Sequence, residues 1–67
     1  MDADKRELLV ALAWMSEQHL ATPNGLEHMC MSAGERAVEV LFKYGLVDSP
    51  QRFARWTEAG ENILKHS

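Results

Sequence analysis

The chain has 67 residues, of which 46% are apolar and 25% are charged, and its formal net charge at pH 7 is −3. This length predicts a single domain over residues 1–67, with a small core and little room for a deep catalytic cavity. A negative net charge opposes binding to nucleic acid phosphates, and a single cysteine, Cys30, excludes an intramolecular disulfide.

The N-terminal segment and the apolar runs indicate a cytoplasmic protein. Acidic residues precede the basic pair Lys5-Arg6, which is unlike the start of a signal peptide. The longest apolar run, residues 8–15, is too short to span a bilayer. We therefore expect a protein that acts in the cytoplasm and not in a membrane.

The first predicted element is a helix over about residues 5–20, with Asp4 as its N-cap and Glu7 at the capping-box position. Its middle turns are apolar nearly all the way round. Either the other helices surround it, or one side, which includes Trp14 and Val10, is left for a partner or for a second copy in a homodimer.

Two further helices are predicted after the break at Thr22-Pro23. Asn24 and Glu27 have capping-box spacing, which predicts a short second helix over about residues 25–30. Ser32 and Glu35 repeat that spacing and predict a third helix over about residues 33–44, although the two helices could also be one long helix.

The third helix has two distinguishable sides. Gly45 is placed to end it in a left-handed conformation. Helical spacing predicts a core side formed by Ala37, Val38, Leu41 and Tyr44, flanked by Val40 and Phe42. The opposite side carries Glu35, Arg36, Glu39 and Lys43, with no net formal charge.

A small wing and a last helix are predicted after Gly45. Residues 46–48 favour a strand, residues 49–52 a turn, and residues 53–56 a return strand. Thr57 is expected to cap the final helix. Gly60 costs that helix roughly 1 kcal/mol relative to alanine, and we expect a close approach by a neighbouring element to explain it.

This pattern resembles winged helix-turn-helix regulators of the MarR and ArsR kind over roughly residues 26–64. The resemblance lies in Gly45-Leu46-Val47, in the segment from Trp56 to Gly60, and in Ile63-Leu64. It implies a mainly α fold with the order helix, helix, helix, two short strands, helix. In the family the third helix reads duplex DNA, and the wing lies beside it.

The charges favour a protein partner over DNA. The wing contributes two bases, Arg52 and Arg55, and the helix beside it is neutral. Winged helices also serve as protein-binding modules, and small acidic phage-encoded inhibitors of the anti-CRISPR kind offer an analogy in size and charge. We expect a regulator or inhibitor that binds a protein, with a dimeric double-stranded DNA-binding regulator as the alternative. The candidate contacts are Arg36, Glu39, Lys43, Arg52 and Arg55.

Enzymatic and metal-binding functions are not expected. His28 and Cys30 are two residues apart, so on a helix their side chains would point in different directions. The sequence also has no pairs of His or Cys residues at the spacings typical of zinc sites. Cys30 is better explained as a small buried residue than as a nucleophile. We therefore predict no catalytic residues, no metal and no cofactor.

Overall fold

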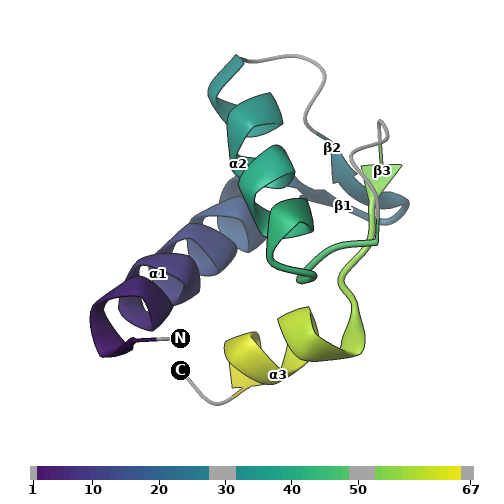
Figure 1. Ribbon diagram of the computed structural model, residues 1–67. Helices are drawn as coiled ribbons and strands as arrows, with labels where there is room; N and C mark the ends of the chain where they lie inside the picture. The colour runs from purple at the N-terminus through teal and green to yellow at the C-terminus, as the bar shows by residue number, and fades with distance from the viewer. Residues whose placement is uncertain (1, 28–31, 49–52, 66–67) are drawn as a thin grey trace.

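The computed structural model describes residues 2–27, 32–48 and 53–65. These described residues are mainly helical, with three helices and a small sheet, and the order of their elements is compatible with a small α-rich winged fold (Figure 1). The elements in chain order are α1 (Ala3–Leu20), β1 (Ala21–Thr22), β2 (Gly25–Glu27), α2 (Ser32–Lys43), β3 (Phe53–Ala54) and α3 (Glu58–Lys65).

Helix α1 begins two residues earlier than the sequence predicts. Its N-cap is Asp2, whose Oδ1 accepts a hydrogen bond of 2.7 Å from the backbone N–H of Lys5. The prediction that Asp4 caps this helix is therefore wrong, because Asp4 already lies in the first turn, where a carboxylate favours the positive end of the helix dipole. The predicted end at Leu20 is confirmed.

The predicted second helix is wrong, because Gly25–Glu27 forms strand β2. Leu26 pairs with Ala21 on one side and with Ala54 on the other, both antiparallel, so that the sheet has the order β1-β2-β3. Gly25 has a φ of +131°, which no helix uses. The capping-box spacing of Asn24 and Glu27 is thus overridden by strand pairing, and a fused long helix is excluded as well.

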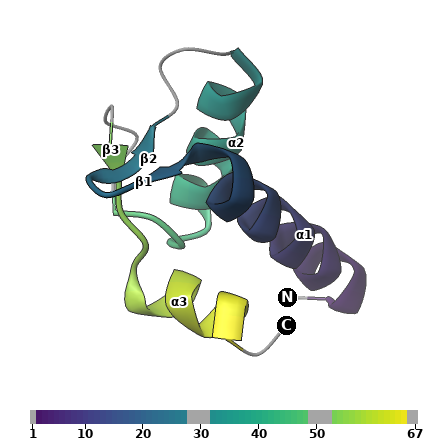
Figure 2. The ribbon, with the colours of Figure 1, turned by 180° about the vertical axis from the view of Figure 1, so that it is seen from behind.

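A tight turn joins β1 to β2 directly after α1 (Figure 2). The hydroxyl of Thr22 accepts from the Asn24 N–H at 3.1 Å and donates to the Gly25 carbonyl at 2.8 Å. A side chain on Gly25 would place its Cβ 2.8 Å from the Ala54 carbonyl oxygen. Glycine is required here both by the backbone conformation and by the close approach of β3.

Helix α2 ends as predicted, with Gly45 at a φ of +76°. The Gly45 N–H donates to the Phe42 carbonyl at 2.9 Å, and the Leu46 N–H donates to the Leu41 carbonyl at 2.8 Å. These two bonds define a Schellman motif, which provides hydrogen-bond donors to carbonyls that have no partner within the helix.

The wing prediction is confirmed for the pairing of its two arms. Val47 forms an antiparallel bridge with Trp56, and the Asp48 N–H donates to the Arg55 carbonyl at 2.9 Å. The return arm has a second pairing that was not predicted, because Phe53–Ala54 forms β3 and pairs with β2. The predicted turn over residues 49–52 lies outside the described residues.

Helix α3 begins as predicted after Thr57, whose hydroxyl accepts from the Gly60 N–H at 3.2 Å and donates to the Gly45 carbonyl at 2.6 Å. The expected close approach at Gly60 is also confirmed, because an added Cβ would overlap the Leu46 carbonyl. A single hydroxyl therefore joins the start of α3 to the end of α2.

One core joins all three helices and the sheet. On α2, Val38 and Leu41 are fully buried, while Ala37 and Tyr44 are half-buried, in agreement with the predicted core side. Val40 and Phe42, predicted to flank it, are exposed to 38% and 45%. The buried apolar residues are Leu9, Ala13, Leu20, Leu26, Val38, Leu41, Leu46, Val47, Ala54 and Ile63.

Candidate functional site

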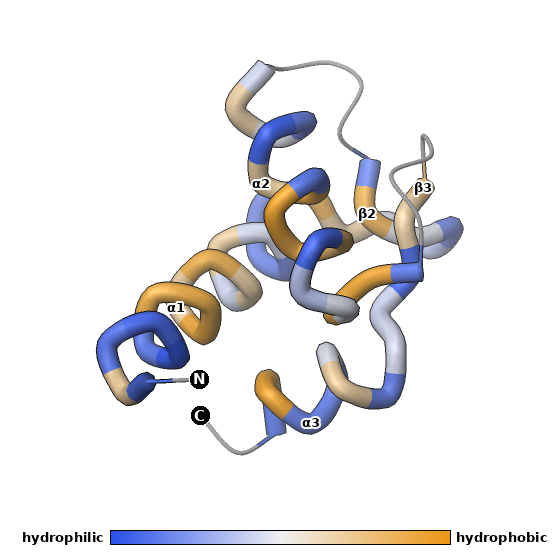
Figure 3. Tube along the Cα trace, viewed as in Figure 1, coloured by the Kyte–Doolittle hydropathy of each residue, from blue (hydrophilic) through white to orange (hydrophobic). Residues whose placement is uncertain are grey.

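The outer side of α1 is apolar over two turns. Leu8 is 71% exposed and Met15 is 60% exposed, and their seven-residue spacing places them on the same side of the helix. Figure 3 shows hydrophobic residues around the middle turns of α1, whereas α2 and α3 alternate between polar and apolar stretches. Of the two explanations for this apolar helix, incomplete coverage by the other helices is the one observed.

The two residues predicted for an apolar interface have different positions. Trp14 is 39% exposed and borders the outer side of α1. Val10 is half-buried and packs against the core. Leu8 and Met15, which are not among the predicted contact residues, are more exposed, because α1 turns its Leu9, Ala13 and Leu20 side toward the core. The sequence predicts that this helix is apolar, but it does not predict which side of the helix faces the core.

The charged side of α2 is solvent-facing, as predicted. Arg36, Glu39 and Lys43 are all exposed and lie opposite the side that carries Val38 and Leu41. Within the described part of the chain, these three side chains form no ion pair or hydrogen bond with one another or with Arg55. These three residues form a mixed-charge surface with two bases and one acid. When Glu35 is included, the formal net charge of this surface is zero.

Arg55 belongs to a different surface from the α2 bases. Its backbone N–H donates to the Asp48 Oδ1 at 3.0 Å, and its side chain is exposed at the edge of a hollow between the sheet and α1. Arg52, the other base of the wing, lies outside the described residues. The four predicted contact residues that the structure describes, Arg36, Glu39, Lys43 and Arg55, are thus not gathered into one site.

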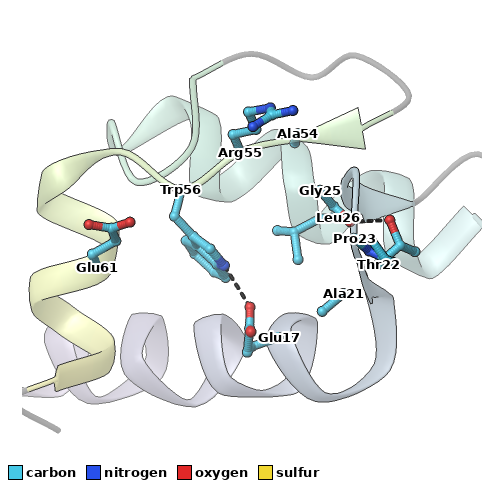
Figure 4. Close-up of a pocket in the computed structure, with 10 residues that line it drawn as sticks. All are labelled: Glu17, Ala21, Thr22, Pro23, Gly25, Leu26, Ala54, Arg55, Trp56 and Glu61. Carbon is cyan, nitrogen blue, oxygen red and sulfur yellow. Dashed lines mark hydrogen bonds between the residues drawn. The ribbon is translucent and has the colours of Figure 1, made fainter.

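The hollow beside Arg55 is the feature that sequence reasoning missed. It has a volume of about 320 Å³ and lies between the end of α1, the β1–β2 hairpin and the segment around Trp56 (Figure 4). Trp56 donates from its Nε1 to the Glu17 Oε2 at 2.7 Å, which joins the wing to α1. Nothing in the local sequence indicates that Glu17 and Trp56 meet, because they are far apart along the chain.

No group of three His, Cys, Asp or Glu side chains in residues 2–27, 32–48 and 53–65 could hold a metal ion. His28 and Cys30 lie outside these ranges. No helix in the same ranges has both the length and the hydropathy needed to cross a membrane.

Comparison with protein-family models, with curated proteins and with solved structures finds no match to this chain.

Proposed function

We propose that this domain is a non-catalytic regulator or inhibitor that binds a protein partner through the outer side of α1. The observation that carries the proposal is the exposure of Leu8 and Met15, at 71% and 60%, on one side of a helix whose opposite side forms the core. Large apolar side chains that lie together on a surface are typical of interaction sites.

The spacing of the exposed residues supports recognition by a groove. A helix that binds in an apolar groove uses anchors at positions i, i+3 or i+4, and i+7. Leu8, Ala11 and Met15 follow that spacing, and all three are exposed. Removing such side chains from water stabilises a complex by roughly 25 cal/mol per Å² of apolar surface, so this side of α1 can supply much of the binding free energy.

The size and charge of the chain are consistent with this proposal. A domain of 67 residues has a small core and benefits from a partner that buries further apolar surface. Its net charge of −3 disfavours nucleic acid as the direct ligand but allows a partner with a basic surface. The partner can itself belong to an assembly that handles nucleic acid.

The test is a pull-down in which three forms of the domain are each immobilised and incubated with extract from the native cell. The amount of partner protein that each form retains is then compared. The double variant Leu8→Gln with Met15→Gln should lose a stoichiometric partner that the unmodified domain retains. The control is Val40→Gln, which removes a 38% exposed apolar side chain from α2 and should retain the partner. Equal recovery by all three forms, or no stoichiometric partner, would contradict the proposal. Sedimentation of the purified domain shows whether the partner is a second copy.

The second candidate is a dimeric regulator that binds double-stranded DNA. Arg36 and Lys43 are exposed on one side of α2, which is the specific observation in its favour. Phosphate contacts make affinity fall steeply with salt. Under this candidate, duplex DNA binds at low salt, and Arg36→Ala with Lys43→Ala reduces both the affinity and its salt dependence. No binding of any duplex at low salt would eliminate it.

A further inference from the structure

The hollow beside Trp56 is separate from the outer side of α1. Glu17 lies nine residues after Leu8, which is two and a half helical turns, so it projects from nearly the opposite side of the helix. The residues that line the hollow come from α1, the hairpin, the Trp56 segment and α3. They are Glu17, Ala21, Thr22, Pro23, Gly25, Leu26, Ala54, Arg55, Trp56 and Glu61.

The charged groups that line the hollow are predominantly acidic within residues 2–27, 32–48 and 53–65. Glu17 is half-buried, and its Oε2 accepts from the Trp56 indole at 2.7 Å. Its second oxygen, Oε1, has no hydrogen-bond partner within the described part of the chain. Glu61 adds a second carboxylate from α3, so that among the described lining residues two acids stand against one base, Arg55. Figure 4 shows Arg55 directed away from Glu17, on the other side of the hollow.

We propose that this hollow binds the guanidinium group of an arginine side chain presented by a polypeptide. An indole is the aromatic group that attracts cations most strongly. A guanidinium is planar and weakly hydrated, so it can stack on an aromatic ring and donate hydrogen bonds to a carboxylate at the same time. Trp56 and Glu17 supply these two partners side by side.

The dimensions of the hollow suit a single side chain. Its volume of about 320 Å³ is at the lower end of the range of roughly 300–1,000 Å³ typical of small-molecule sites. Leu26, which is buried, and Ala21 form an apolar wall next to the polar groups. The methylene stem of an arginine can lie against such a wall while its head remains at the carboxylate. This site goes beyond the proposed role of α1, because it uses different residues on a different surface.

The test is a titration of the isotopically labelled domain with N-acetyl-arginine amide, followed by NMR at the Trp56 indole N–H. A Trp14→Phe background leaves Trp56 as the single indole, because the chain has two tryptophans. We expect a saturable shift with a Kd of about 1–10 mM, the range for a ligand of this size. N-acetyl-citrulline amide, which has nearly the same shape without the charge, should bind at least about tenfold more weakly.

Variants separate the charge of Glu17 from its structural role. Glu17→Gln keeps an oxygen for the Trp56 indole but removes the charge, and it should weaken arginine binding at least about tenfold. The control, Glu7→Gln, changes the same charge at an exposed position on the same helix and should leave affinity within about twofold, because exposed distant charges are screened. If Glu17→Gln lowers stability, Glu61→Gln provides the second test, since Glu61 is exposed and its loss should weaken binding about threefold.

Three results would overturn the proposal. The first is equal binding of the arginine and citrulline probes. The second is unchanged arginine affinity in both Glu17→Gln and Glu61→Gln. The third is preferential binding of N-acetyl-aspartate amide, which would assign the hollow to an anion held by Arg55. None of these results depends on Leu8 or Met15, so the protein-binding role of α1 stands or falls separately.

Discussion

Replacing Gly60 with alanine tests the packing of α3 against the segment that follows α2. An added Cβ would overlap the Leu46 carbonyl oxygen, and it would lie 2.8 Å from Trp56 Cε3 and 3.0 Å from the Leu46 carbonyl carbon. Both neighbours are held in place. The Leu46 carbonyl accepts from the Thr57 N–H at 3.0 Å, and the Trp56 indole donates to Glu17. Neither can move away without straining a hydrogen bond.

The expected loss of stability follows from three opposing contributions. Alanine is favoured over glycine inside a helix by about 1 kcal/mol. Overpacking against fixed neighbours costs about 1–3 kcal/mol, and weakening the bond between Thr57 and Leu46 costs about 1 kcal/mol more. The net effect is a destabilisation of about 1–3 kcal/mol. For a domain of this size a loss of 2 kcal/mol lowers the Tm by about 8–16 °C.

Thermal unfolding followed by circular dichroism measures this change, and Ala59→Gly provides the matched control. Ala59 is exposed and precedes Gly60 in α3, so its replacement should cost only the helix propensity difference of about 1 kcal/mol. If propensity alone mattered, Gly60→Ala would raise the Tm by about as much as Ala59→Gly lowers it. A Tm for Gly60→Ala at or above that of the unmodified protein would refute the packing argument.

Three further substitutions test local features by the same unfolding assay. Gly45→Ala should cost about 1–2 kcal/mol because φ is +76°, while no atom beyond the adjacent residues lies within 4 Å of the added Cβ. Gly45→Asn should cost less, and equal stability of all three forms would contradict the left-handed C-cap. Asp2→Ala should cost about 1 kcal/mol through loss of the α1 cap, whereas Asp2→Asn keeps the acceptor and should have little effect. Ser16→Ala should raise stability by about 1 kcal/mol, because the Ser16 hydroxyl is buried with no hydrogen-bond partner among the described residues. A lower Tm for this variant would show that the hydroxyl has a partner in solution.

Several features could be predicted because they depend on residues close together in the chain. The end of α2 at Gly45 follows from the steric freedom of glycine, and the start of α3 follows from the capping hydroxyl of Thr57. The core side of α2 follows from helical periodicity, since Val38 and Leu41 recur at the spacing of one face. The bridge between Val47 and Trp56 could be anticipated from two apolar segments separated by residues typical of a turn.

The candidate surfaces depend on how these elements pack. The run around residues 8–15 predicts an apolar helix, but it does not decide that Leu8 and Met15 stay in water while Leu9 and Ala13 are buried. That choice is made by the positions of α2 and α3 around α1. The hollow is likewise invisible in the sequence, because it needs Glu17 and Trp56 to meet across the fold.

The sequence by itself therefore determined where helices end, how α3 is capped and which side of α2 is buried, because each depends on contacts within a few residues. Tertiary structure alone decided that Gly25–Glu27 is a strand, since the antiparallel pairing of β2 with β1 on one side and with β3 on the other outweighs a local capping signal. It also decided which apolar side chains of α1 remain exposed and which charged groups surround Trp56. The packing of α2 and α3 against one side of α1 reveals which side is left open, because that packing buries Leu9 and Ala13 and leaves Leu8 and Met15 exposed.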